Sequence, residues 1–506
     1  MDASPVSPVL IVVSVAYLAL IGGLAVWSWG RTKTAADFFV AGRGLGLWVT
    51  ALATMSSAFS GFLFLGGPGL TYRIGAASWL IVMPIGVTGG LLAWTVAKRL
   101  RLLAEVRPIY TVPDAVAARY GCRRAAGLAA LAITFGTVAY LAAQLLALGV
   151  LIHTLFGFEA RFGTAAMPVA VACGGLVVTA YATLGGMVAG VYTDVVQGVL
   201  MIAAAVGVFL FAWQATAGPA SAVAAVASSE VFGAAFLDPL GGRAPALLGL
   251  SFFFVFAVGV LGQPHTLHKF LMLRDPRHLR RLPAVLGVSQ ALVVLLWLGV
   301  GLAVPALVAA GRLAPIETPD QVTPIFLLHH TPPWLAGWVF AGVLAAIMST
   351  ADSFINIASA ALVRDLPRAF GRPVKDELRQ GRVASVLVSV TAAAVALAYG
   401  DLIALLGTFA YGIFAAALTP CLALGLSWKR AGADAASASI VTGMATALGF
   451  ELWAKQTWLD LPPSPLAPGV LPAVPAMAAA FTVFLVVAWW RPAPPPAPDV
   501  EAVMEL

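Results

Sequence analysis

Long apolar runs separated by short polar connections fill almost the whole chain. A helix that crosses a membrane needs about 20 predominantly apolar residues, and thirteen stretches approach or exceed that length. The pattern therefore predicts an all-α polytopic membrane protein with about 13 transmembrane helices. The expected spans are 9–29, 46–70, 78–97, 125–153, 163–182, 190–213, 244–264, 283–306, 334–363, 383–398, 402–426, 433–453 and 471–490.

Composition supports a chain that is embedded along nearly its whole length. Of the 506 residues, 61% are hydrophobic and only 10% are charged, whereas a soluble protein carries about 25% charged residues. Cys122, Cys173 and Cys421 lie far apart, which favours neither a disulfide framework nor a metal cluster. The sequence contains no phosphate-binding P-loop and no nucleophile–base pair, so we expect neither ATP-driven transport nor an enzyme.

The positions of the basic residues predict the orientation in the membrane. With the N-terminus outside, 24 of the 29 Lys and Arg residues fall in inner connections, as the positive-inside rule requires. The net charge of +7 therefore reports topology rather than nucleic-acid binding. On this count no basic residue lies within a span, and Lys269 belongs to an inner loop together with interfacial His265 and His268. The outer connections hold Arg73, Arg161, Arg243, Arg312 and Lys455.

Helix-breaking residues interrupt the second and the seventh span. The second contains Ser56 to Gly61 followed by Gly66-Gly67-Pro68-Gly69, and the seventh ends with Gly259 to Pro264. Broken helices in corresponding positions of two halves mark the binding site of inverted-repeat transporters, although Gly and Pro also serve close helix packing. We expect the substrate at these breaks, near Ser60, Gly61, Phe256, Val260 and Gln263, with Tyr140 and Gln144 of the fourth span as further candidates.

Two hydroxyls and an acid lie within the apolar span 334–363. Ser349, Thr350 and Asp352 are costly in hydrocarbon, so they should face the helix bundle or a wet cavity. Their oxygens suit a hard cation such as Na⁺, and Ala346 shares a helix face with both hydroxyls. Alternatively, the hydroxyls bond to their own helix or hold two helices together. Asp194, near the inner end of the sixth span, is either an interfacial acid or a charge on an ion path.

Four segments are similar to motifs of the sodium:solute symporter family, and most similar to its sodium/proline symporter branch. They are Ala36 to Arg43, Gly185 to Gln197, Gly262 to His265 and Ala345 to Ser353, and the resemblance covers about residues 36–430. It implies a five-plus-five inverted-repeat core of the leucine-transporter type. The expected division is a first helix and loop (1–45), a first repeat (46–213), a second repeat (214–430), two accessory helices (431–490) and a disordered cytoplasmic tail (491–506).

The resemblance also implies a sodium site. Its ligands would be the carbonyls of Ser56, Phe59 and Ala346 and the hydroxyls of Ser349 and Thr350, while Asp194 matches an acid that the family links to sodium affinity. The chain departs from the proline branch where an Asp is replaced by Ala58, and where a Trp and a Tyr are replaced by Phe256 and Val260.

The implied function is a symporter of the plasma (inner) membrane that couples Na⁺ entry to uptake of a small organic solute such as proline. H⁺ coupling, uptake of a monocarboxylate or another amino acid, and a transporter-like membrane sensor remain alternatives. The sequence leaves the oligomeric state open.

Overall fold

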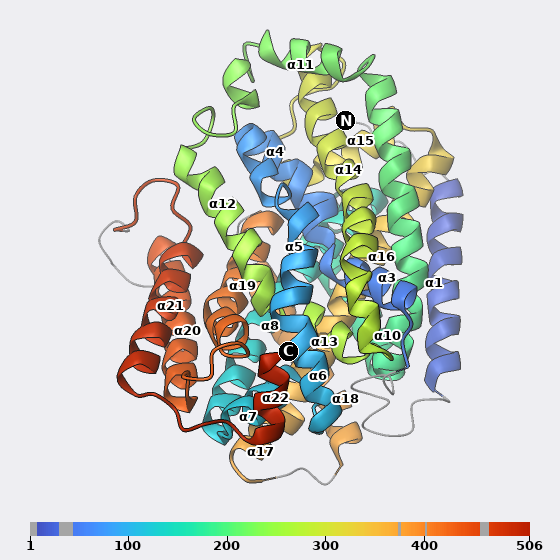
Figure 1. The fold of residues 1–506 in the computed structure, drawn as a ribbon. Coiled ribbons are helices and arrows are strands. Elements are labelled where there is room, and N and C mark those ends of the chain that lie inside the picture. Colours follow the sequence, from blue (N-terminus) through green and yellow to red (C-terminus); the bar gives the residue numbers. More distant parts are fainter. Residues whose placement is uncertain (1–7, 30–43, 373–375, 400–401, 456–464) are drawn as a thin grey trace.

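The computed structural model describes residues 8–29, 44–372, 376–399, 402–455 and 465–506 (Figure 1). Side chains are described throughout these ranges except at 25, 27–29, 184–189 and 455. The motif at 36–43 lies outside the described residues. Within the described part the chain is helical, and its only extended pairing is one isolated bridge between Leu45 and Leu273. The all-α class is therefore confirmed.

The helices are joined by short π- and 3₁₀-helical segments. In chain order they are α1 (Pro8–Trp29), α3 (Leu47–Ala58), η2 (Phe62–Gly66), α4 (Gly67–Ile74), η3 (Gly75–Ile81), α5 (Ile85–Leu92), η4 (Ala93–Ala97), α6 (Lys98–Val106), α7 (Val112–Tyr120), α8 (Arg123–Phe156), α9 (Phe158–Phe162), η5 (Gly163–Ala165), α10 (Ala166–Ala215), α11 (Pro219–Ala227), η6 (Ala234–Leu237), α12 (Ala246–Gly259), η7 (Val260–Gly262), α13 (Pro264–Leu271), η8 (Pro276–Arg280), α14 (Leu282–Ala309), η9 (Pro319–Gln321), α15 (Val322–His330), α16 (Pro333–Ala360), η10 (Ala361–Asp365), α17 (Leu366–Ala369), α18 (Glu377–Tyr399), α19 (Ile403–Thr419), η11 (Pro420–Leu424), α20 (Ala433–Lys455), α21 (Ala473–Trp490) and α22 (Pro498–Glu505).

Ten helices among the described residues are long and apolar enough to cross a membrane. An eleventh span results if the pair Leu47–Ala58 and Phe62–Ile81, bent by 55°, is taken as one. The expected first span corresponds to α1, whose described apolar part is shorter, and the expected third span is divided among η3, α5 and η4. The count of thirteen thus stays a prediction.

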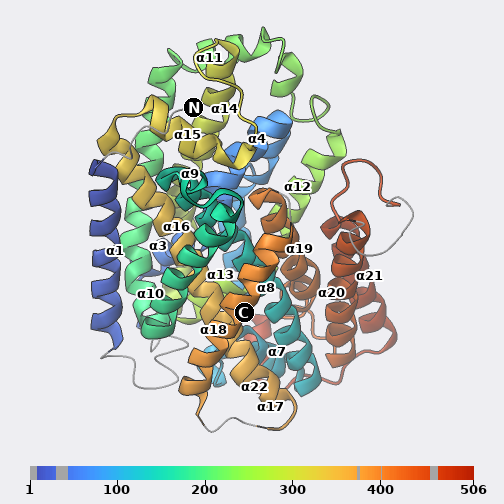
Figure 2. The ribbon, with the colours of Figure 1, turned by 180° about the vertical axis from the view of Figure 1, so that it is seen from behind.

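The fifth and sixth spans, expected as two separate helices, belong to one element, the 50-residue helix α10, because the helical hydrogen bonding continues between them. Tyr181 and Thr193 nevertheless touch through their hydroxyls. In a straight helix, residues twelve apart are separated by about 18 Å, so the chain must reverse direction between them. Figures 1 and 2 show the two arms of α10 running antiparallel.

The helices form one bundle with α1 on one side and the pair α20 and α21 on the other (Figures 1 and 2). Helix α16 lies inside, because all of its residues from Val339 to Ala360 are buried. A helix that is apolar around its whole circumference has no side for solvent and suits the centre of a bundle. Its Ser349, Thr350 and Asp352 therefore face other helices rather than lipid.

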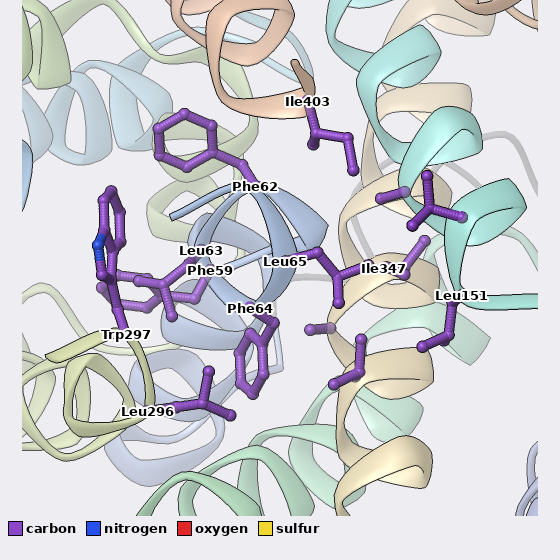
Figure 3. Packing of buried hydrophobic residues seen from close by; sticks show 14 of the residues in the cluster. Phe59, Phe62, Leu63, Phe64, Leu65, Leu151, Leu296, Trp297, Ile347 and Ile403 are labelled. Atoms are coloured by element: carbon purple, nitrogen blue, oxygen red, sulfur yellow. The ribbon is translucent and has the colours of Figure 1, made fainter. Parts of the chain in front are cut away.

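Buried aromatic and aliphatic side chains enclose the break in the second span (Figure 3). Phe62 and Phe64 of η2 pack with Trp297 of α14 and Ile347 of α16, all almost fully buried. Gly67 makes this packing possible, because a Cβ there would lie 2.2 Å from the Trp297 ring. The irregular backbone is thus shielded by protein, as non-helical segments at membrane depth must be.

The end of the chain is ordered, so the expectation of a disordered tail at 491–506 is wrong for residues 498–505. They form α22, whose Val500, Val503 and Met504 are buried against the rest of the protein. The prolines before α22 favour extended chain, whereas the three- and four-residue spacing of its apolar positions gives one apolar helix face. Ion pairs add to the docking, including Lys429 Nζ to Glu501 Oε1 at 2.7 Å.

Candidate functional site: a cation cluster beside an aromatic cavity

The second span is broken between α3 and η2, where Phe59 is extended (φ −102°, ψ 116°). The last helical bond of α3 runs from the Phe59 N–H to the Met55 carbonyl. Beyond it, the amides bond elsewhere: Gly61 N–H donates to Gln144 Oε1 (3.0 Å) and Leu63 N–H to the Ser60 carbonyl (2.9 Å). The carbonyls of the break are consequently released from the helical pattern.

The seventh span is broken in the same way. Helix α12 ends at Gly259, Gln263 is extended (φ −78°, ψ 107°), and α13 begins at Pro264, which has no N–H to continue a helix. The Gln263 amide spans the break by donating from Nε2 to the carbonyls of Gly259 (3.0 Å) and Tyr411 (3.2 Å). Both breaks predicted from glycine and proline are therefore present.

The predicted hydroxyl pair on α16 faces the end of α3. Ser56 Oγ donates to Ser349 Oγ at 2.7 Å, and Thr350 Oγ1 donates to the Ser57 carbonyl at 3.1 Å. These bonds cross between helices, so the alternative that the hydroxyls bond to their own helix does not describe them. Ala346 is buried one turn earlier on α16. The structure thus brings together Ser56, Ser349 and Thr350, with the Phe59 carbonyl in the adjoining break.

Asp194 of α10 is buried next to this group and forms an ion pair. Its Oδ2 lies 2.6 Å from Lys269 Nζ and accepts a hydrogen bond from Ser57 Oγ at 3.4 Å. Each of the two paired side chains is only 1% exposed. Because an ammonium balances this carboxylate, the field of Asp194 alone adds little attraction for a cation at Ser349.

Lys269 is the charged residue that the sequence analysis misplaced. It was expected in an inner loop, but it belongs to α13 and lies within the apolar span Ala246–Leu271. After the break, α13 enters the protein, and its Leu267, Phe270 and Leu271 are fully buried. His265 and His268 are also buried inside the protein, at 3% exposure each, and their position at the membrane interface stays a prediction.

A second carboxylate, Asp352 of α16, is buried near the first. Its Oδ1 accepts a hydrogen bond from Asn356 Nδ2 at 3.0 Å, while its Oδ2 has no hydrogen-bond partner among the side chains that the structure describes. Gly190 of α10 makes room for it, since a Cβ there would lie 2.2 Å from Oδ2. The following residue, Ser353, has its Oγ 3.1 Å from Ser57 Oγ. Sequence reasoning identified Asp352 as a polar residue in the span but gave it no role.

An aromatic cavity of roughly 80 Å³ lies between the two breaks. Four predicted substrate-site residues line it: Tyr140, Phe256, Val260 and Gln263. The other walls include Ala58, Phe59, Phe62, Leu63, Thr88, His265, Thr266, Gln290, Trp297 and Tyr411. The predicted residues Ser60, Gly61 and Gln144 do not line it. They hold the broken backbone behind it, where Ser60 Oγ accepts the Phe62 N–H and Gln144 accepts the Gly61 N–H.

The cavity wall combines stacked rings with uncharged polar atoms. Phe256 stacks on Tyr411 (4.3 Å between centroids) and on Phe62 (5.7 Å). Within the described part of the chain, three polar atoms of the wall have no hydrogen-bond partner: Gln263 Oε1, Gln290 Oε1 and His265 Nδ1. Leaving such atoms unpaired costs about 1–3 kcal/mol each, so they are suited to bind a polar ligand. The described lining contains no Asp, Glu, Lys or Arg.

Comparison with known proteins gives consistent matches. A model of the sodium:solute symporter family matches residues 38–443. The high-affinity proline transporter of Bacillus subtilis is 29% identical over 457 residues, covering 85% of this chain and 89% of that protein. The sodium/pantothenate symporter of Haemophilus influenzae is 28% identical, covering 86% and 90%.

Among solved structures, a Na⁺-coupled sialic acid symporter in a substrate-bound outward-open state superposes with a TM-score of 0.76. Its sequence is 18% identical, and the match covers 97% of this chain and 99% of that one. At this identity the likeness concerns the fold, and the expected leucine-transporter-type core is thereby confirmed.

Proposed function

We propose where this chain, which belongs to the sodium:solute symporter family, binds Na⁺ and where it binds its solute. As a member of that family it is a Na⁺-coupled multi-pass membrane transporter of a small organic solute rather than an enzyme. Na⁺ binds between α3 and α16, and the solute binds in the aromatic cavity beside it. We further propose that the solute is a compact amino acid such as proline. The protein resides in the plasma membrane with its N-terminus outside and its C-terminus inside.

The observation that carries the sodium proposal is the contact of Ser56 and Ser349, 2.7 Å apart, at the released backbone of the second span. Na⁺ prefers a shell of oxygen ligands, and this group offers the hydroxyls of Ser349 and Thr350. The carbonyls of Ser56, Phe59 and Ala346 would complete the shell. A cation there joins two helices, which gives binding a direct effect on their relative position.

The solute proposal follows from the size and the walls of the cavity. A water needs roughly 10–15 Å³ of such space, so a cavity of roughly 80 Å³ has room for about five to eight waters or a solute of comparable size. The ring of proline would lie against Phe256 and Tyr411, and its N–H groups would donate to the unpaired oxygens of Gln263 and Gln290. A solute as long as pantothenate would not fit without rearrangement.

Uptake by the purified protein in proteoliposomes tests the proposal. We expect an inward Na⁺ gradient to drive accumulation of labelled proline, and a K⁺ gradient of the same size to drive none. Unlabelled proline, pantothenate and lactate serve as competitors. Na⁺-driven uptake that pantothenate or lactate blocks and proline does not would refute the solute assignment. Uptake driven by a pH gradient without Na⁺ would refute the cation site, and absence of any uptake would favour a sensor.

A further inference from the structure

Two carboxylates and one ammonium are buried together next to the proposed sodium site. Asp194, Asp352 and Lys269 are each 1% exposed. They come from three elements, α10, α16 and α13, that meet beside the break in the second span. Counted as ionised groups they carry one net negative charge. Excess charge inside a protein is costly unless a partner balances it, so this cluster calls for one further positive charge, which is a bound cation or a proton.

We propose that Lys269 acts as a tethered cation, which permanently balances Asp194 and leaves the charge of Asp352 to attract a single transported Na⁺. The proposal rests on the sodium site proposed above and adds its charge balance and stoichiometry. Lys269 is a positioning residue in this scheme. It fills the place that a second free cation would otherwise take.

The geometry distinguishes the two carboxylates. Asp194 has an ammonium at 2.6 Å, whereas Asp352 has only the neutral amide of Asn356 at 3.0 Å. Each carboxylate keeps one oxygen without a hydrogen-bond partner among the described residues, Asp194 Oδ1 and Asp352 Oδ2. What sets Asp352 apart is that the described residues place no ammonium against it, although the side chain is almost fully buried. An unpaired, buried carboxylate oxygen is a strong acceptor that can coordinate a cation. Tyr17, Tyr181 and His265 also interact with members of the cluster, and each is counted as neutral.

Asp352 also lies at the right place on the helix. It follows Ser349 by three residues, so the two share a face of α16. Its neighbour Ser353 approaches Ser57 to 3.1 Å, and the Ser57 carbonyl accepts from Thr350. A cation held by the hydroxyl pair is therefore within about one helical turn of the unbalanced carboxylate, where charges still interact strongly in a low dielectric.

A purely structural role for the ion pair predicts a different behaviour. If Lys269 and Asp194 only pin α13 to α10, their charges matter to each other and not to Na⁺. Neutralising Asp352 would then leave the sodium dependence unchanged. The number of sodium ions moved with each solute would also be independent of Lys269.

Charge-changing variants in proteoliposomes separate the two views. The measurements are the half-saturating Na⁺ concentration and the ratio of radioactive sodium to solute taken up. Asp352→Asn should raise the half-saturating concentration on the order of tenfold. Lys269→Gln should lower it and raise the ratio from one sodium to two. The double variant Lys269→Gln/Asp352→Asn restores one net negative charge and should return both values toward wild type.

Two further variants guard against misfolding and nonspecific effects. Lys269→Arg keeps the charge and should keep the wild-type ratio, even if Lys269→Gln is poorly folded. Asp114→Asn removes a distant, partly buried ion pair with Arg364 (3.0 Å) and should leave both measurements unchanged.

The outcomes identify which proposal fails. Na⁺-independent uptake by the wild type would overturn the proposed function itself. If uptake by the wild type depends on sodium, either of two results would overturn the tethered-cation proposal and leave the proposed function intact. The first is that Asp352→Asn is unshifted and the double variant is no closer to wild type than Lys269→Gln. The second is that the wild type already moves two sodium ions per solute.

Discussion

The Asp194 carboxylate lies 2.6 Å from the Lys269 ammonium, so a buried ion pair joins α10 to α13, the part of the seventh span that follows its break. Breaking such a pair from one side leaves an uncompensated charge, which costs about 3–5 kcal/mol. The pair therefore fixes α13 against the helix that also carries Gly190. Through Ser57, the same carboxylate contacts the end of α3. One acid thus connects the first repeat to the break in the second.

Removing either predicted sodium-ligand hydroxyl should weaken the response to Na⁺. We expect Ser349→Ala and Thr350→Val each to raise the half-saturating Na⁺ concentration roughly 5- to 150-fold, since each loses an interaction worth about 1–3 kcal/mol. Ser359→Ala on the same helix is the matched control, because Ser359 Oγ bonds to Ile355 O and Ser385 Oγ, away from the site. If all three variants keep the wild-type Na⁺ dependence, the hydroxyls serve packing only.

Shortening the central aromatic side chain of the cavity should weaken solute binding. Phe256→Ala removes the ring that stacks on Tyr411 and Phe62, and we expect the apparent KM for the solute to rise roughly 10- to 100-fold. The half-saturating Na⁺ concentration at saturating solute should change little. Phe253→Ala on the outer face of α12, where Phe253 is 38% exposed, should leave KM unchanged. Equal effects of both variants would place the solute elsewhere.

A single methyl group at position 190 should disturb the sodium response. In Gly190→Ala the new Cβ would lie 2.2 Å from Asp352 Oδ2, so the carboxylate must move. We expect the half-saturating Na⁺ concentration to rise several-fold. Gly175→Ala is the control on the same helix, because its Cβ would meet Leu145 only at 3.8 Å.

The basic residues predict which connections face the cell interior. In a background with Cys122, Cys173 and Cys421 replaced by Ser, a cysteine introduced as Arg277→Cys should resist a membrane-impermeant maleimide added to intact cells. A cysteine introduced as Ala314→Cys should react. Position 277 lies in the short segment η8 between α13 and α14, and position 314 lies in the connection between α14 and η9. Labelling at 277 in intact cells would contradict thirteen spans with an outside N-terminus.

The sequence predicts those parts of the site in which a residue differs in character from its neighbours along the chain. Ser349 and Thr350 stood out as hydroxyls in an apolar run, and Gly61 and Pro264 stood out as breakers at membrane depth. Lys269 did not, because a basic loop follows it and a break precedes it, so it looked like the start of that loop. The sequence feature that could have revealed it is the pair of apolar neighbours Leu267 and Phe270. They indicate that α13 runs into the interior of the protein.

Other features depend on contacts between distant segments, which local patterns do not contain. The balance of charge between Asp194 and Asp352 follows from which of them Lys269 reaches, and that is set by the packing of α13 on α10. Gln144 was predicted to bind solute, yet its amide oxygen is engaged by the Gly61 N–H. Only the assembled bundle shows that it supports the backbone instead.

Helix α22 cross-links two segments that lie far apart in the sequence, the end of α6 and the chain that follows η11. It contacts α6 through the bidentate pair of Arg107 and Asp499, with Nη2 to Oδ1 at 2.8 Å, and it holds Lys429, which follows η11, through Glu501. The helix is only about 12 Å long, so the two segments that it contacts can separate only a short distance while both contacts persist. Any movement that separates these two segments must either carry α22 along with one of them or break its ionic contacts with the other.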